Sequence, residues 1–132
     1  MSYIHEIQKS LDFIEENIDQ KLSLKQMAQL ALCSEYHFHR IFHSAVGVPL
    51  NEYIRKRRLS MAAGMLRDGD NKIVAISQRC GFESQTAFTR AFKGVFGLTP
   101  GQFRKDDLPA TFYEKVNLSG RKFLPSYRGI TF

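Results

Sequence analysis

The sequence has no tryptophan, only two cysteines and no long apolar segment. Cys33 and Cys80 are too few for a disulfide framework or a thiolate zinc site, and we expect both to be small buried hydrophobic residues. No stretch approaches the roughly 20 apolar residues of a membrane helix, and the start MSYIHEIQKS lacks the apolar region of a signal peptide. We therefore expect a cytosolic protein, and no cofactor.

The positive charge of the chain is concentrated in its middle. Of 132 residues, 43% are hydrophobic, which is too apolar for a disordered chain and fits one domain or two small lobes. The net charge is +6, and residues 34–105 hold 12 Lys and Arg against 5 Asp and Glu. An excess of charged residues usually forms only a solvated surface. A concentrated basic segment also suggests a polyanionic partner such as nucleic acid.

Hydrophobic residues recur at helical spacing in seven segments. Ser23 with Gln26, and Thr99 with Gln102, have the spacing of a capping box, and Gly47 ends the third segment. The predicted helices cover residues 3–18, 24–32, 35–46, 49–67, 73–80, 85–95 and 100–103. The sequence therefore predicts an all-α fold of about seven helices.

The fourth predicted helix changes its buried side half-way along. Leu50, Tyr53 and Ile54 lie on one face, whereas the apolar residues from Leu59 to Leu66 lie on roughly the opposite face. A helix with this pattern is expected to bridge two separate cores.

The two halves of the chain are an internal repeat. The matching pairs, at an offset of 50, are Ser34 and Ser84, Phe38 and Phe88, Arg40 and Arg90, Phe42 and Phe92, Gly47 and Gly97, and Tyr53 and Phe103. In the preceding helix the offset is 49, since Leu32 matches Gly81, so one residue is inserted in the second turn near Glu83.

Each half has the pattern of a helix-turn-helix, in which a short helix and a tight turn precede a capped helix that enters the DNA major groove. The outward face of each second helix is polar and includes an arginine able to grip guanine through two hydrogen bonds. The predicted base-contacting residues are Tyr36, His39 and Arg40 in the first unit and Gln85, Thr86, Thr89 and Arg90 in the second.

The alternative for Arg40 and Arg90 is that each is a plain surface residue or pairs with Glu35 or Glu83. Their matched positions in a repeated unit favour base reading. Other polar and cationic residues are expected to contact phosphates, which adds affinity without sequence information. The predicted phosphate-contacting residues are Ser34, His43, Arg55, Arg57, Arg79, Ser84, Lys93 and Lys105, with Lys56 and Arg58 as further candidates.

The length of the bridging helix suits joint action of the two units. About 18 residues span about 27 Å, comparable to the 34 Å that separates same-face major grooves. A monomer can then place both helices in successive grooves, and the small mismatch favours bent DNA. The predicted units are a first helix-turn-helix subdomain over 1–48, the bridging helix over 49–69, a second helix-turn-helix subdomain over 70–105, and a C-terminal extension of unknown role over 106–132.

The repeat resembles the DNA-binding domain of the AraC/XylS family of bacterial transcription regulators over roughly residues 5–105. The segments that carry the likeness are GFESQTAFTRAFKGVFGLTPGQFRK, from Gly81 to Lys105, and HFHRIFHSAVGVPLNEYIRKRRL, from His37. Within the family the chain is most similar to the MarA, SoxS and Rob subgroup. This resemblance implies a monomeric, nucleoid-associated activator that binds promoter DNA and recruits RNA polymerase, with the base-reading positions given above.

The sequence departs from the subgroup in the first unit. Tyr36 and His39 stand where the subgroup commonly has Trp and Gln, so the first half-site is not inferred from the resemblance. Leu32 stands where the turn usually has Gly; if that position needs a positive φ, Leu costs on the order of 1 kcal/mol.

Residues 106–132 lie outside the resemblance. TFYEKVNL, the turn-like Ser119-Gly120 and RKFL predict a β-hairpin, which must pack on the body or begin something longer because an isolated hairpin is only marginally stable. Rob-like proteins continue into a ligand-sensing domain at this point, so a remnant of that domain and a mobile tail are both open.

The sequence leaves three alternative functions open. His39 and His43 share a helical face, as zinc ligands do, but the catalytic pattern needs Glu where this chain has Arg40; we therefore expect a protein that is not an enzyme and has no metal. A sequence-blind architectural protein would favour diffuse charge and minor-groove wedges over two ordered faces. The chain can also be the DNA-binding portion of a larger ligand-sensing regulator.

Overall fold

The computed structural model describes residues 3–106 and 112–118 of the chain. These residues form seven α-helices and no β-strand, which confirms the predicted all-α fold. The helices are α1 (Ile4–Glu16), α2 (Leu24–Leu30), α3 (Glu35–Val46), α4 (Leu50–Asp68), α5 (Ile73–Arg79), α6 (Gln85–Phe96) and α7 (Pro100–Lys105). None of the helices in this part of the chain combines the length and hydropathy needed to span a membrane.

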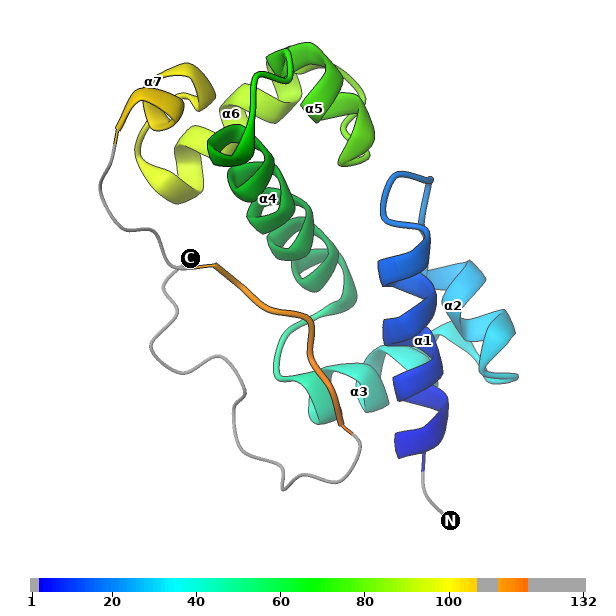
Figure 1. Cartoon of the computed structure of the whole chain (residues 1–132). Coiled ribbons are helices and arrows are strands. Elements are labelled where there is room, and N and C mark those ends of the chain that lie inside the picture. The colour runs from blue at the N-terminus through cyan, green and yellow to red at the C-terminus, as the bar shows by residue number, and fades with distance from the viewer. Residues whose placement is uncertain (1–2, 107–111, 119–132) are drawn as a thin grey trace.

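The long helix α4 runs through the centre of the molecule, with α1 to α3 around its first half and α5 to α7 around its second (Figure 1). Leu50, Tyr53 and Ile54 belong to a first hydrophobic core built with α1 to α3. Leu59 and Leu66 belong to a second core built with α5 to α7. The change of buried side read from the sequence therefore corresponds to a helix shared by two cores.

The helix bounds reproduce the internal repeat. α3 and α6 begin and end 50 residues apart, whereas α2 and α5 begin and end 49 residues apart. The inserted residue therefore lies in the turn between α5 and α6, as the sequence indicated. Each turn contains one residue with a positive φ: Leu32 at 57° in the first unit and Gly81 at 84° in the second.

Serine and threonine hydroxyls cap the N-termini of four of the helices. The Oγ atoms of Ser34 and Ser84 accept hydrogen bonds from the backbone N–H groups of His37 and Ala87, which orients the first turns of α3 and α6. The predicted capping box at Thr99 and Gln102 is confirmed. The box predicted at Ser23 is only half formed. Its hydroxyl accepts from the Gln26 N–H, but Oε1 of Gln26 is buried without a hydrogen-bond partner among the described residues.

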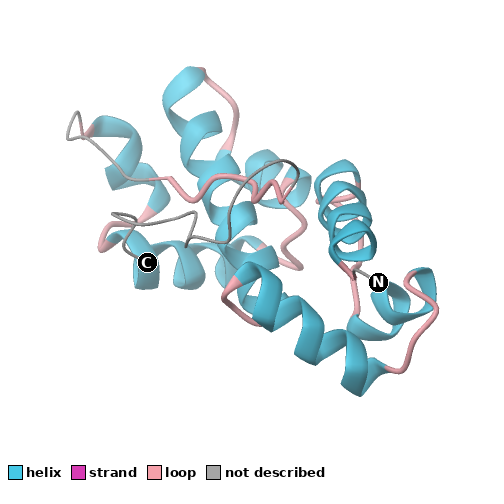
Figure 2. Cartoon of the chain, turned by 90° about the horizontal axis from the view of Figure 1, so that it is seen from below, coloured by secondary structure: helices cyan, strands magenta, loops and turns pink. Residues whose placement is uncertain are grey.

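Residues 112–118 form a strap that runs back along α4 towards α1 (Figures 1 and 2). Tyr113, Val116 and Leu118 are at most 5% exposed and complete the first core. The predicted first strand of a hairpin is wrong for these residues, because side chains of α1 and α4 accept their backbone N–H groups in place of a partner strand. The rest of the hairpin prediction, from Ser119 onward, lies outside the described residues.

The two units also touch directly at the turn of the second unit. Arg58 of α4 donates hydrogen bonds to the carbonyl oxygens of Ile18 and Gln20, at 3.0 and 2.7 Å, in the loop after α1. Gly81 lies against this joint: a Cβ there would sit 2.6 Å from the Ile18 oxygen and 2.7 Å from the Arg58 guanidinium. The positive φ favours glycine at this position, and the close approach of Arg58 requires it.

Candidate nucleic-acid interface

Helices α3 and α6 lie at opposite ends of α4 (Figure 1). Each packs through buried phenylalanines, Phe38 and Phe42 in α3 and Phe88 and Phe92 in α6, which leaves the opposite face of the helix in solvent. These are the second helices of the two helix-turn-helix units, and the outward faces carry all seven residues predicted to contact bases.

The outward face of α3 is aromatic and rich in histidine. Tyr36 is 70% exposed, and the guanidinium carbon of Arg40 lies 5.6 Å from the centroid of its ring. His39, Arg40, His43 and Ser44 line one shallow hollow on this surface. The structure thus brings the predicted residues together and adds Ser44, which sequence analysis missed although it lies one turn beyond Arg40.

The outward face of α6 carries the matching set. Gln85, Thr86, Thr89 and Arg90 line a single shallow hollow, so the four residues predicted for this helix are neighbours in space. Arg90 and Gln85 are exposed, whereas Thr89 is half-buried. Amide, hydroxyl and guanidinium groups on one surface supply hydrogen-bond donors and acceptors suited to the edges of base pairs.

Neither arginine is used in an ion pair within the described residues. The four ion pairs found there are Lys9 with Glu6, Lys56 with Glu52, Arg57 with Glu15, and Lys115 with Asp12. The alternative in which Glu35 or Glu83 holds Arg40 or Arg90 therefore has no support in this part of the chain. Both guanidinium groups are exposed and can meet an external partner.

The basic run from Arg55 to Arg58 contributes less to the surface than its sequence suggests. The Arg57 side chain is only 12% exposed, pairs with Glu15 and donates to the carbonyl oxygen of Tyr113. Lys56 is also largely covered, and Arg58 is committed to the joint with the loop after α1, where burial lowers the pKa of its guanidinium. Within this run only Arg55 is exposed.

The other predicted phosphate-contacting residues lie at the surface. Ser34, His43, Arg79, Ser84, Lys93 and Lys105 are all exposed. The serine hydroxyls accept from the first turn of α3 or α6, so each still has its own hydrogen to donate to an anion. Arg57 is not available for the phosphate contact predicted for it, because its side chain is largely buried and paired with Glu15.

The histidine pair and the cysteines do not form a metal site by themselves. The rings of His39 and His43 have centroids 6.2 Å apart, but no group of three or more metal-ligating side chains occurs in the described residues. Burial raises the pKa of the Cys80 thiol to about 11, and burial also raises that of Cys33. Both cysteines therefore hold their protons at neutral pH. Cys80 is buried, as expected, whereas Cys33 is only half-buried.

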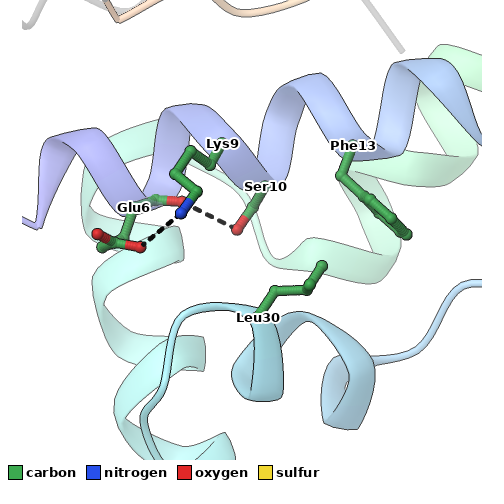
Figure 3. Close-up of a pocket in the computed structure, with 5 residues that line it drawn as sticks. All are labelled: Glu6, Lys9, Ser10, Phe13 and Leu30. Atoms are coloured by element: carbon green, nitrogen blue, oxygen red, sulfur yellow. Dashed lines mark hydrogen bonds and ion pairs between the residues drawn. The ribbon is translucent and has the colours of Figure 1, made fainter.

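A separate hollow between α1 and α2 is lined by Glu6, Lys9, Ser10, Phe13 and Leu30 (Figure 3). Its volume is about 130 Å³, below the roughly 300 Å³ at which ordinary small-molecule sites begin. Its polar groups are engaged with one another: Lys9 pairs with Glu6 at 3.8 Å, and the Ser10 hydroxyl donates to the Glu6 carbonyl oxygen at 3.1 Å. This hollow therefore does not have the size or the open polar groups of an effector site.

Comparison with known proteins identifies the repeat as a helix-turn-helix domain. The family model of a helix-turn-helix domain matches residues 27–106, which run from within α2 past the end of α7. The AraC-type DNA-binding transcriptional regulator of Chromobacterium violaceum has a solved structure that superimposes with a TM-score of 0.69 at 27% identity, covering 76% of this chain and 90% of that one.

Two curated relatives differ in how much of their length this chain spans. The multiple antibiotic resistance protein MarA of Escherichia coli is 35% identical over 105 residues, which is 80% of either chain. The uncharacterized HTH-type transcriptional regulator YbfP of Bacillus subtilis is 39% identical over 104 residues, which is 79% of this chain but only 35% of YbfP. The chain thus spans most of MarA and about a third of YbfP.

Proposed function

This chain belongs to the AraC/XylS family and is a sequence-specific DNA-binding transcription regulator, and we propose that it binds as a monomer with α3 and α6 in successive major grooves. The observation that carries the proposal is the pair of matched faces. Arg40 and Arg90 occupy the same position in the repeat, both are exposed, and each lies in a hollow with its predicted base-reading neighbours.

The length of α4 supports binding of one duplex by one chain. α4 has 19 residues, so it is about 28 Å long at 1.5 Å per residue, against the 34 Å repeat of a straight duplex. A joint held by Arg58 leaves the protein little freedom to lengthen this span. We expect the DNA to bend towards the protein to bring both grooves into contact.

Base reading and phosphate binding are assigned to different residues. In this proposal Tyr36, His39 and Arg40 read the first half-site, and Gln85, Thr86, Thr89 and Arg90 read the second. The phosphate contacts come from Ser34, His43, Arg55, Arg79, Ser84, Lys93 and Lys105. These contacts fix register and orientation on the duplex, whereas specificity comes from the base edges.

The family resemblance supports a promoter-bound activator in the bacterial cytoplasm that contacts RNA polymerase and has no enzymatic role. Transcription in vitro from a promoter that contains the selected site tests the direction of control, and reduced transcript on addition of the protein would make it a repressor. The length of YbfP favours one alternative, in which this chain is the DNA-binding part of a larger ligand-sensing regulator. The mass of the native protein isolated from its source decides between them.

Selection of bound duplexes from a random pool tests the proposal. We expect one asymmetric site of two half-sites, bound one chain per duplex. We also expect an affinity for this site at least about 1,000-fold above that for random DNA at fixed salt. Scrambling either half-site separately should weaken binding. An affinity that ignores sequence, or a stoichiometry of two chains per site, would contradict the proposal.

A further inference from the structure

The strap, residues 112–118, is held by side chains of two helices. The Tyr113 N–H donates to Oγ of Ser60 at 2.7 Å, and the Val116 N–H donates to the hydroxyl of Tyr53 at 3.2 Å; both acceptors belong to α4. Burial raises the pKa of Tyr53 to about 12, so its hydroxyl stays neutral. The strap is therefore fixed at two backbone positions along the middle of α4.

The other end of the strap is fixed to α1. The Leu118 N–H donates to Oε1 of Gln8 at 2.7 Å, and Nζ of Lys115 lies 2.6 Å from a carboxylate oxygen of Asp12. The Lys115 ammonium holds the pKa of Asp12 below its usual range, so this pair stabilises the fold above about pH 4 and is lost as the pH falls further. A third connection joins all three segments, because Arg57 of α4 binds Glu15 of α1 and the Tyr113 carbonyl oxygen.

The strap thus connects α1 to α4 through hydrogen bonds separate from those of the Arg58 joint, although Arg57 and Arg58 are neighbours in α4. The second half of α4 is part of the second core, through Leu59 and Leu66. Whatever fixes the direction in which α4 leaves the first unit therefore also fixes the position of α6 relative to α3. The strap itself lies outside the matched family region, which ends at residue 106.

We propose that the strap is a brace that sets the spacing between the two half-sites, with Tyr113, Ser60 and Tyr53 as positioning residues for DNA reading. This inference rests on the proposed two-groove function. Once one helix is bound, binding of the second is intramolecular, and its strength depends on whether the connection holds it at the required distance. A braced α4 favours one spacing, whereas a released α4 accepts several.

Duplexes with altered half-site spacing test the brace. They carry the selected site, the same site with one base pair removed, and the same site with one base pair added between the half-sites. Full-length protein with Tyr53→Phe and Ser60→Ala loses both acceptors on α4 while its packing is nearly unchanged. Tyr113→Ala is a second, stronger variant. The control is Ser77→Ala, which removes a buried serine of the second unit whose hydroxyl donates to Val74 within α5.

The readout is the ratio of affinities for the selected and the altered spacings. A mere loss of stability reduces the active fraction on every duplex alike, so it leaves this ratio unchanged. We expect the wild type and Ser77→Ala to prefer the selected spacing, and the ratio to fall at least about fivefold in the two strap variants, at the low end of couplings between sites in one protein.

Failure of the brace and failure of two-groove binding would give different results. If the wild type needs both half-sites but the strap variants keep its spacing ratio, or if the wild type shows no spacing preference, the brace is overturned and the two-groove function stands. If scrambling one half-site leaves wild-type binding unchanged, the two-groove function itself fails.

Discussion

The two helix-turn-helix units form the same turn with different residues at its left-handed position. Leu32 is 92% exposed, with a φ of 57°. Gly81, at 84°, lies against Ile18 and Arg58. The turn of the first unit faces solvent, so a side chain fits there at the cost of backbone strain. The turn of the second unit is part of the joint between units, so no side chain fits. Repeated sequence therefore fixes the backbone, while the surroundings of each copy decide which residues it tolerates.

The largest effect is expected from a methyl group at the joint. Gly81→Ala combines an unfavourable φ with a clash against Ile18 and Arg58 and should lower the free energy of unfolding by about 3 kcal/mol. Chemical denaturation measures the loss. Gly97→Ala is the matched control, because Gly97 also has a positive φ but has nothing within 4 Å of an added Cβ; it should cost about 1 kcal/mol. Equal losses at the two positions would show that the joint adds nothing.

Helices α3 and α6 can be compared through their matched arginines, Arg40 and Arg90. Arg40→Ala and Arg90→Ala should each weaken binding to the selected site by about 1 to 3 kcal/mol and leave binding to random DNA nearly unchanged. Titration of both duplexes at one salt concentration measures this. Arg79→Ala is the control, since loss of a phosphate contact should weaken both kinds of binding alike. A similar pattern in Arg40→Ala or Arg90→Ala would remove that arginine from the base-reading set.

Removing the strain at the first turn should stabilise the protein. Leu32→Gly relieves a left-handed leucine but gives the unfolded chain more freedom, so we expect a net gain of about 1 kcal/mol or less. Thermal unfolding of this variant measures the gain. Leu32→Ala keeps the strained φ and should leave the melting temperature unchanged. If both variants melt like the wild type, the strain at Leu32 has no measurable cost.

Much of this fold could be read from local pattern. The repeat, the caps at Ser34 and Ser84, and the change of side in α4 are all short-range signals, and the outward faces of α3 and α6 follow from helical period alone. Arg57 and Arg58 are bound internally by Glu15 and by the loop after α1, about 40 residues away. No local pattern reveals such partners.

The strap also shows that local pattern does not reveal partners that are distant in sequence. Alternating apolar residues around Val116 suggested a strand, because the sequence does not show that Ser60, Tyr53 and Gln8 accept the N–H groups of this segment. Period-2 hydrophobicity would place Phe112 on the buried side with Val116 and Leu118, but Phe112 is exposed and Tyr113 is buried. The pattern also does not report whether a neighbouring strand or a set of side chains satisfies the backbone.

Packing of Tyr113 and Leu118 into the first core has a consequence for how the chain folds as it is made. The second unit closes its core with residues between Leu59 and Phe103, whereas the first core closes only when residues about 100 positions after Ile7 and Leu11 arrive. Contacts between distant residues form late and slow folding. On a ribosome, the unit translated first would therefore be the last to reach its final packing.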